Sequence, residues 1–315
     1  MKKILITGGL GFVGGRLVKK LAGKFDVTVS TRKNIEDGIL ELNGRVMNVL
    51  HNQLFSIDCF PENIDTVIHL AALNEWDCIK HPSEAIKVNI DETRIILENA
   101  INTGVKNFIY FSTAHIYGSP LQGIITEETM PFPVHPYAIT HKAAEDYVVA
   151  AALKKKINSI VIRLSNSFGA PQLPSVNRWT LLANDLCRQA IEKESLTLLS
   201  NGCQYRDFIC LSDVEEVIDM MVCRAADFNR IIYNLGAGVS MRVIDMANVI
   251  AAMNTLLFNK SIPVYLPADA IASDEPTLLF SIERLALEGC VIKNDVQTEI
   301  KKLLQFCHQN FSKLD

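Results

Sequence analysis

The feature that most restricts the fold of this chain is an apolar segment, Lys2 to Thr7, that runs directly into glycines at positions 8, 11 and 14. Glycine has no Cβ, so Gly8 allows the chain to turn off a strand, and Gly11 allows backbone N–H groups to approach a phosphate. Gly14 allows the next segment, a helix expected over residues 12–22, to pack closely on the sheet. The N-terminus of such a helix carries partial positive charge and favours an anion. The segment therefore predicts a dinucleotide pyrophosphate site.

The first 165 residues alternate between short apolar runs and longer segments with helical periodicity. This alternation is typical of an α/β fold, here a Rossmann doubly wound parallel sheet with helices on both faces. Two long helices are expected over residues 83–103 and 137–156. The strands are expected over residues 2–7, 26–31, 45–49, 66–71, 107–113 and 159–164.

The pattern changes after Leu164, where proline and polar loops begin. A helix is expected near residues 179–192, a strand and helix over 208–226, a strand at 231–235, and then an irregular C-terminal part. We predict a Rossmann domain and a smaller C-terminal substrate-binding domain that closes over a second ligand as a lid. The Rossmann domain comprises residues 1–165 and 207–235, and the lid comprises residues 166–206 and 236–315.

The composition argues against several other classes of protein. With 49% hydrophobic and 21% charged residues, the 315-residue chain can bury a large core. The net charge of -4 gives no general attraction to nucleic acid or anionic membranes, and no apolar run is long enough for a membrane span. We expect a cytoplasmic protein. The eight cysteines are scattered without a C-x-x-C pair, which is typical of small buried hydrophobic residues and not of disulfides or a metal site.

Several ordered motifs follow the glycine turn. His69-Leu70-Ala71-Ala72 follows the fourth strand, Ser112-Thr113 at the end of the next strand leads into a turn that ends at Gly118, and Pro136-Tyr137 opens a helix. In this order the motifs resemble those of the extended short-chain dehydrogenase/reductases. More narrowly, they resemble the NAD-dependent epimerase/dehydratase family that acts on nucleotide sugars. The resemblance runs from residue 1 to about residue 240.

The resemblance implies two catalytic residues. In the family a tyrosine is the acid/base on a sugar hydroxyl or carbonyl, and a serine or threonine hydroxyl holds the same oxygen. By register these residues are Tyr137 and Thr113. The alternative is a buried tyrosine and a strand-end threonine without catalytic roles.

The chain departs from the family four residues after the tyrosine. The family has a lysine there, which binds the nicotinamide ribose and lowers the pKa of tyrosine from its ordinary value of about 10. This chain has His141, and Lys142 lies one place later, about 100° around the helix. We expect His141 to replace the lysine and to leave Tyr137 less acidic, because imidazole is cationic only below a pKa of about 6.5. The alternative is a surface histidine beside a solvated lysine.

The residues after the threonine bear on the reaction. Family dehydratases commonly have an Asp-Glu pair there, whereas this chain has Ala114 and His115, so elimination of water is disfavoured. Epimerisation or ketone reduction of a nucleotide-activated sugar remains, with hydride moving between sugar and nicotinamide. A second hypothesis is a catalytically weak dinucleotide-binding protein with a regulatory or scaffolding role, because the lysine is missing.

The end of the second strand indicates which cofactor is used. NAD enzymes usually have Asp or Glu there for the ribose 2′-hydroxyl, whereas this chain has Thr31-Arg32-Lys33, which suits the 2′-phosphate of NADP. NADP is therefore favoured over NAD. In the alternative, Arg32 and Lys33 form a solvated loop and Thr31 binds an NAD ribose. The expected cofactor-binding residues are Gly8, Gly11, Phe12, Val13, Thr31, Arg32, Asn48, Val49, Leu70, Ala71, Ala72, Tyr137 and His141.

The second ligand is expected beyond Leu164. The segment Arg163 to Gly169 is similar to the family's Arg-x-x-Asn-x-Tyr-Gly, in which Asn166 would reach the substrate. Arg206 would bind a diphosphate or ribose, unless it is an ion-pair partner of Asp207 or Asp213. Weaker candidates for substrate binding are Asn177, Arg178 and Trp179.

Two further expectations come from the family. Relatives often bring a second arginine to the diphosphate, but residues 271–276 contain none, which weakens the assignment of a nucleotide sugar. A homodimer built from the helices at 83–103 and 137–156 is expected. The usual setting of such relatives is the synthesis of cell-surface polysaccharide.

Overall fold

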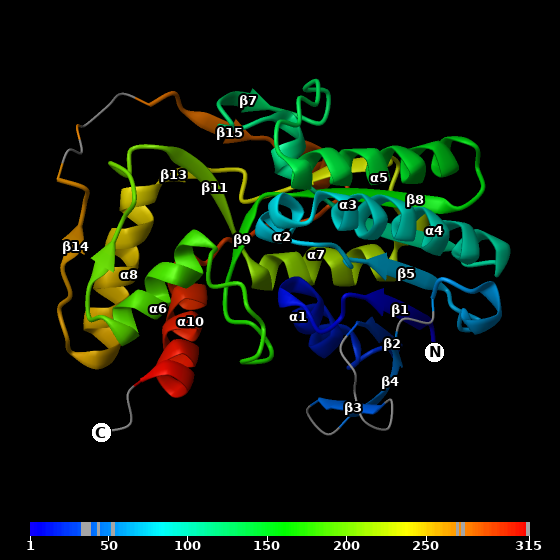
Figure 1. The fold of residues 1–315 in the computed structure, drawn as a ribbon, viewed down its shortest axis with the longest axis horizontal. Helices are drawn as coiled ribbons and strands as arrows, with labels where there is room; N and C mark the ends of the chain where they lie inside the picture. Colours follow the sequence, from blue (N-terminus) through cyan, green and yellow to red (C-terminus); the bar gives the residue numbers. More distant parts are fainter. Residues whose placement is uncertain (33–38, 43–44, 52–53, 269–270, 272–274, 313–315) are drawn as a thin grey trace.

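The computed structural model describes residues 1–32, 39–42, 45–51, 54–268, 271 and 275–312 (Figure 1). The strands of its central sheet are β1 (Lys3–Thr7), β2 (Asp26–Thr31), β3 (Ile39–Leu42), β4 (Arg45–His51), β5 (Thr66–His69), β6 (Asn107–Thr113), β8 (Asn158–Leu164) and β12 (Ile232–Leu235). The smaller strands are β7 (Gly123–Ile125), β9 (Asn166–Phe168), β10 (Leu196–Thr197), β11 (Tyr205–Cys210), β13 (Ser240–Arg242), β14 (Val264–Tyr265) and β15 (Leu278–Phe280).

The α-helices are α1 (Phe12–Leu21), α2 (Glu75–Lys80), α3 (Pro82–Ala85), α4 (Glu92–Asn102), α5 (Pro136–Leu153), α6 (Leu182–Glu192), α7 (Leu211–Cys223), α8 (Val243–Phe258), α9 (Glu283–Leu287) and α10 (Val296–Phe311). Short 3₁₀ or π segments are η2 (Ile57–Cys59), η3 (Ile86–Asp91), η4 (Ala114–Tyr117) and η5 (Ala225–Asp227).

The central sheet confirms the predicted doubly wound α/β architecture. Its strand order is β12-β8-β6-β5-β1-β2-β4-β3. Neighbouring strands are parallel except at one edge, where β3 runs antiparallel to β4. The edge strand β3 was not expected from the sequence.

Each face of the sheet has its own core, because successive side chains of a strand point to opposite faces. Ile4 and Ile6 of β1 lie in one cluster with residues of α1 and α7. Leu5 lies in another cluster, with residues of α4 and α5. The helices thus hold the sheet between them and fix the ends of β1, β5 and β6, where the site lies.

The single helix expected over residues 83–103 is divided into α3, the π-helical η3 and α4. The side chain of Asn89, within η3, is buried and bonds to two other segments. Its Oδ1 accepts from the N–H of Leu73 at 2.7 Å, and its Nδ2 donates to the hydroxyl of Thr140 at 3.0 Å. A π turn of this kind adds a residue to the helix and often marks a functional position. Here it ties the segment after β5 to α5.

The C-terminal part is largely helical, so the expectation of an irregular segment was wrong. Helices α8 and α10 contain 16 residues each and pack with α6 to one side of the central sheet (Figure 1). Their buried residues recur at helical spacing, as in Met246, Ile250 and Met253. The pattern was present in the sequence but was not used.

Most of the expected lid shares a core distinct from that of the sheet, centred on α6, α8 and α10. Leu285 and Cys290, which belong to the expected lid, pack instead against the sheet core under α1 and α7. All eight cysteines are free, and Cys78, Cys187 and Cys210 are among the buried ones. Among the described residues, no helix has the length and apolar character needed to cross a membrane.

Candidate functional site

The turn from β1 into α1 is built from glycines that leave no room for side chains. Gly8 has a φ of +66°, in the left-handed region that favours glycine. A Cβ on Gly8 would lie 3.0 Å from the amide nitrogen of Ala71, and a Cβ on Gly14 would lie 2.2 Å from the carbonyl oxygen of Gly8. The N-terminus of α1 therefore meets a bare backbone cradle, which fits the pyrophosphate of a dinucleotide.

A cavity of about 230 Å³ lies beside this turn. The expected cofactor residues that line it are Gly8, Gly11, Thr31, Arg32, Leu70, Ala71 and Ala72. Further walls come from residues that sequence reasoning did not include, among them Leu54, Phe55 and Glu92.

Asn48 and Val49 do not line either of the two cavities beside the glycine turn. The reason is that β4 continues to His51, so both residues lie inside the strand, where Val49 packs in the core. Arg32 is exposed at the edge of both cavities. Lys33 and residues 272–274 lie outside the described residues.

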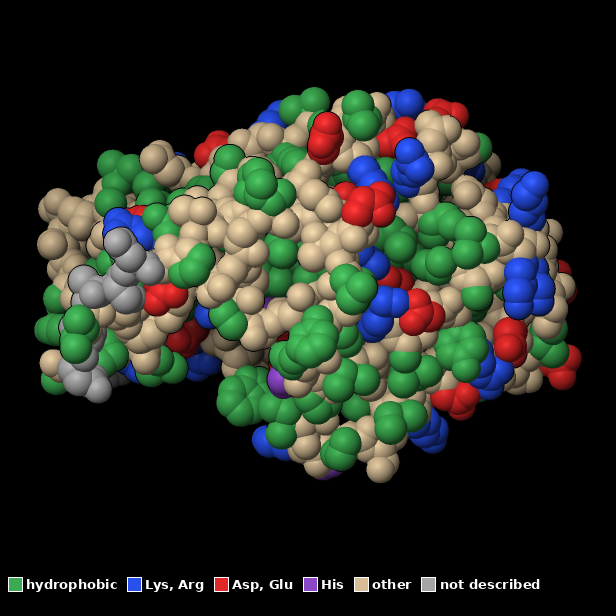
Figure 2. Space-filling view, turned by 90° about the horizontal axis from the view of Figure 1, so that it is seen from above, with side chains coloured by type: hydrophobic (Ala, Val, Ile, Leu, Met, Phe, Trp, Pro, Cys, Tyr) green, Lys and Arg blue, Asp and Glu red, His purple; other side chains and the backbone are tan. Residues whose placement is uncertain are grey.

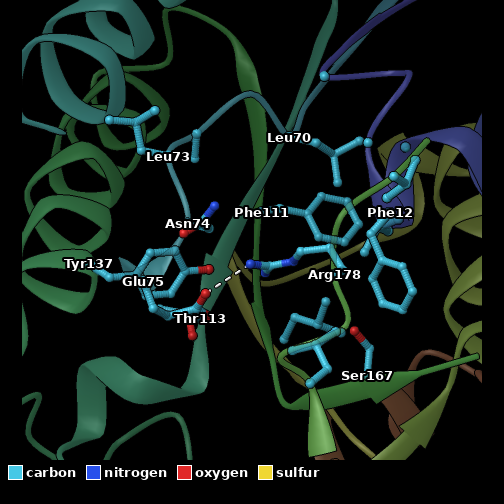
Figure 3. Close-up of a pocket in the computed structure, with 18 of the residues that line it drawn as sticks. Phe12, Leu70, Leu73, Asn74, Glu75, Phe111, Thr113, Tyr137, Ser167 and Arg178 are labelled. Atoms are coloured by element: carbon cyan, nitrogen blue, oxygen red, sulfur yellow. Dashed lines mark hydrogen bonds and ion pairs between the residues drawn. The ribbon is translucent and has the colours of Figure 1, made fainter. Parts of the chain in front are cut away.

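A larger cavity, about 470 Å³, extends from the glycine turn to the first turns of α5 (Figure 3). Phe12, Val13, Thr113, Tyr137 and His141 all line it, so the structure brings the three expected catalytic residues to one place. A cavity of this size is suited to the reactive end of a dinucleotide together with a small substrate.

Tyr137 is placed by the start of α5. Pro136 occupies the first helical position, and the Nδ1 of His135 accepts from the N–H of Tyr137 at 3.1 Å. Thr113 is the last residue of β6, and its hydroxyl lies near enough to the Tyr137 phenol to lower the pKa of that phenol. Figure 3 shows both side chains on the same side of the cavity.

Burial raises the pKa of Tyr137 above its ordinary value, and the negative charge of Glu75 raises it further. The charge of Arg178 and the hydrogen bond with Thr113 lower it, but they do not offset the burial. The phenol is therefore protonated near neutral pH.

His141 is buried one helical turn after Tyr137, so the alternative of a surface histidine is wrong. The two rings lie 4.4 Å apart between centroids, and His141 Nδ1 lies 3.0 Å from the hydroxyl of Tyr110. Its Nε2 has no hydrogen-bond partner within the described part of the chain. Burial lowers the pKa of His141 to about 4, so the imidazole is neutral near pH 7. Lys142 faces away and pairs with Asp146 on α5.

The sequence prediction missed an ion pair that crosses the larger cavity. Glu75 is the first residue of α2, and Arg178 lies in the loop between β9 and α6. The two side chains form an ion pair, in which Arg178 Nη1 lies 2.8 Å from Glu75 Oε2 (Figure 3). The charge of Arg178 lowers the pKa of Glu75, although burial alone would raise it. The partners are 103 positions apart in the sequence, and no sequence pattern indicated this contact.

His115, also in the cavity, stands where the family's dehydratases have a carboxylate. Burial lowers the pKa of His115, and Glu75 acts in the opposite direction. A neutral imidazole therefore takes the place of an acidic side chain.

The expected substrate residues are divided between two environments. Asn166 and Asn177 line the larger cavity, with Asn166 Nδ2 donating to the carbonyl oxygen of Asp207 at 2.9 Å. Arg206 is exposed outside that lining. Trp179 does not reach the cavity, because it packs in the lid core with its ring centroid 4.9 Å from that of Phe311.

The alternative role for Arg206, an ion pair with Asp207 or Asp213, is absent among the described residues. Asp207 accepts hydrogen bonds from Ser165 and from the N–H groups of Ala237 and Gly238. Asp213 accepts from the backbone N–H groups of Lys293 and Asn294. Both carboxylates therefore hold loops together.

A doubly wound sheet with a bare glycine turn, next to a paired tyrosine and threonine, defines a dinucleotide-binding protein of the short-chain dehydrogenase/reductase class. The chain belongs to the NAD dependent epimerase/dehydratase family, whose model matches residues 4–236.

Known relatives differ in reaction and in cofactor. A dTDP-D-glucose 4,6-dehydratase of Dictyostelium discoideum is 27% identical over 274 residues, which cover 79% of this chain and 62% of that protein. The chain thus spans less than two thirds of that relative's length. The UDP-glucuronic acid 4-epimerase of Bacillus cereus, in complex with NAD, matches with a TM-score of 0.79 at 22% identity over 98% of this chain and 96% of its own. RMD from Pseudomonas aeruginosa, complexed with NADPH, matches with a TM-score of 0.75 at 20% identity over 98% and 99%. At these identities the two structures show a shared fold.

Proposed function

We propose that this protein is an NAD(P)-dependent epimerase or 4-ketoreductase of a nucleotide-activated sugar, with Tyr137 as its acid/base. The observation that carries the proposal is that Tyr137 and Thr113 line the same cavity, which begins at the glycine turn. Both hydroxyls are placed to hold one oxygen of a substrate bound in that cavity.

The chain's own residues suit the two ends of a dinucleotide. The glycine turn and the N-terminus of α1 would hold the pyrophosphate, and Arg32 would hold a ribose 2′-phosphate, which favours NADP. His141 would donate from its unpartnered Nε2 to a nicotinamide ribose hydroxyl. When bound, the dinucleotide supplies or accepts hydride.

Proton handling falls to Tyr137. A phenol that is protonated near pH 7 can donate to the carbonyl oxygen of a 4-keto sugar, while Thr113 keeps that oxygen in place. Removing a proton from a sugar hydroxyl needs the opposite charge state, which a high pKa disfavours. The protonated phenol therefore suits the reduction step, in which it donates its proton, whereas the oxidation step of an epimerase would need the deprotonated form.

Only Ala114 and His115 disfavour dehydration, whereas two of the relatives are dTDP-D-glucose 4,6-dehydratases. A direct test is to incubate the purified protein with UDP-glucose, dTDP-glucose and their 4-keto-6-deoxy derivatives, with NADPH or NADH, and to identify the products. A 4-epimer or a reduced ketone supports the proposal. Conversion of the glucose nucleotides to 4-keto-6-deoxy sugars would overturn its exclusion of dehydration.

The Tyr137→Phe variant tests the assigned chemistry. We expect it to lose turnover while still binding dinucleotide, because only the phenolic hydroxyl is removed. Tyr265→Phe, at an exposed position of β14, is the matched control. Full turnover in Tyr137→Phe would refute the assignment.

One observation favours the second hypothesis, a catalytically weak dinucleotide-binding protein. The neutral His141 gives Tyr137 no fixed positive charge. Dinucleotide binding without turnover of any nucleotide sugar, equal in the parent and in Tyr137→Phe, would support this function.

We also propose a homodimer that forms through α2, α5 and η3. These elements expose large apolar side chains, among them Trp76, Ile79, Ile86, Ile139 and Tyr147. Figure 2 shows apolar side chains gathered on the face above α5. Light scattering should give twice the mass of one chain for the parent protein, and the mass of one chain for Ile86→Glu.

A cytoplasmic location remains a prediction, which cell fractionation would test.

A further inference from the structure

The larger cavity lacks the lysine charge of the family but contains another cation. Arg178 enters from the loop between β9 and α6, on the side of the expected substrate, whereas the family's lysine would enter from α5. Figure 3 shows its side chain extending toward Glu75, next to Tyr137 and Thr113. Its charge lowers the pKa of Tyr137, and the charge of Tyr137 in turn raises the pKa of Arg178. The two groups are therefore electrostatically coupled.

The loop that carries Arg178 is docked and not free. Val176 is buried against Phe12 of α1 and Leu211 of α7. A Cβ on Gly15 would lie only 3.1 Å from the Cβ of Gln172, which shows how closely the loop approaches α1. Arg178 is thus held at a fixed place over the cavity.

We propose that Arg178 is a positioning residue for the proton of Tyr137: it brings positive charge to the phenol from the substrate side, where the missing lysine would have brought it from α5. The larger effect of Glu75 opposes that charge and helps to keep the phenol protonated. This inference rests on the proposed acid/base role of Tyr137. The inference also predicts that the Arg178 charge lowers the pKa of the Tyr137 phenol only while the loop from β9 to α6 lies against α2.

The other groups that face Tyr137 do not provide this charge. His141 is neutral, Thr113 contributes a hydrogen bond, and Glu75 and the Cys78 thiol oppose ionisation of the phenol. Further titratable neighbours are Tyr110 of β6, His115 of η4 and His135, whose Nδ1 accepts from the N–H of Tyr137. Burial disfavours the charged form of Tyr110 and of His115.

Removal of each half of the ion pair gives opposite expectations. Loss of the cation in Arg178→Met should make the phenol less acidic, whereas loss of the anion in Glu75→Gln should make it more acidic. The side-chain amide introduced by Glu75→Gln still offers an oxygen that can accept from Arg178. A pair that only braced the loop would give no such difference in sign, because either variant would loosen the same contact.

The test uses the full-length chain with 3-fluorotyrosine at position 137 and follows the ¹⁹F resonance against pH. This label lowers the intrinsic pKa of the phenol and reports it without any substrate. We expect the midpoint to rise by about 1 pH unit or more in Arg178→Met, to fall by a similar amount in Glu75→Gln, and to stay near the parent in Arg178→Lys. Arg242→Met, which breaks an exposed pair with Asp245, is the control and should not shift it.

Two outcomes separate this inference from the proposed function. Equal midpoints in the parent and Arg178→Met, or shifts of the same sign in Arg178→Met and Glu75→Gln, would overturn the role of Arg178 even if Tyr137→Phe is inactive. Should Arg178→Met fail to fold, the comparison of Glu75→Gln and Arg178→Lys with the parent still decides the matter, because the first must shift and the second must not. Full activity of Tyr137→Phe would instead overturn the proposed function.

Discussion

Gly14→Ala should damage both the fold and the dinucleotide site, whereas the same change one residue later should not. The Cβ that Gly14→Ala introduces would lie 2.2 Å from the carbonyl oxygen of Gly8, where separations below 3.0 Å are essentially never seen. The obstacle is backbone on both sides, so the first turn of α1 must move away from the glycine turn. Gly15→Ala meets only the side chain of Gln172, at 3.1 Å, which a shift of a few tenths of an ångström relieves.

The two variants make the same chemical change at neighbouring positions of α1, so their other contributions to the free energy of unfolding are alike. Each gains up to about 1 kcal/mol of helix propensity in the same turn of α1. Only Gly14→Ala adds a steric cost, toward the upper end of the roughly 1–3 kcal/mol of an overpacked core. We therefore expect Gly14→Ala to be less stable than Gly15→Ala by about 2 kcal/mol or more, with a melting temperature lower by roughly 4 °C or more.

The assay is thermal unfolding together with a fluorescence titration with NADPH. Because movement of α1 also displaces the N–H groups that face the phosphates, Gly14→Ala should bind at least about tenfold more weakly than Gly15→Ala. Equal melting temperatures and equal affinities in the two variants would refute the close-packing argument.

Four further predictions concern charge. Arg32→Ser should weaken NADPH binding by about tenfold and leave NADH binding unchanged in the same titration; equal losses would show that Arg32 does not bind the 2′-phosphate. His141→Lys should move the pH–rate profile to lower pH by adding a cation beside Tyr137, and an unchanged rate and profile would contradict the assignment of His141 to the lysine position. Burial lowers the pKa of His69 to about 3 and that of His141 to about 4, so below pH 6.5 the unfolded chain takes up protons that the folded chain does not, and stability falls. Between pH 7.5 and 5.5 each should cost about 1.4 kcal/mol in denaturant unfolding, and His69→Gln should remove one such contribution. Arg163→Met, which leaves the buried Glu145 without its partner at 2.6 Å, should cost about 3–5 kcal/mol, and adding Glu145→Leu should recover part of that loss.

The Rossmann half was predictable because its signals are local. An apolar strand that ends in Gly8 and a helix that buries Leu17, Val18 and Leu21 can be recognised within one window of the sequence. The π turn at Asn89 has no such signal, because it depends on hydrogen bonds to Leu73 and Thr140 across three segments.

The positions of the proposed catalytic residues were predictable from motifs, but their electrostatics were not. Register alone places Thr113, Tyr137 and His141 at one cavity, whereas the Glu75 and Arg178 pair joins the start of α2 to a loop that is distant in the sequence. Burial also depends on the tertiary fold. Val49 and Trp179 were expected to contact ligands, but both are buried in hydrophobic cores. The sequence around these two residues did not indicate that burial.

The central sheet is completed by residues that are synthesised late. The edge of β8 stays unpaired until β12 emerges from the ribosome, and Leu285 and Cys290 must follow before the sheet core is filled. Arg16 of α1 then meets Glu299 of α10, 3.0 Å away and 283 positions later in the sequence, only after α10 has been synthesised. A nascent chain therefore carries an open strand edge and an incomplete core through much of its translation, the state in which chains aggregate or need chaperones. Premature termination between the end of α5 and β12 should release a fragment that cells degrade, even though that fragment contains the glycine turn, Thr113, Tyr137 and His141.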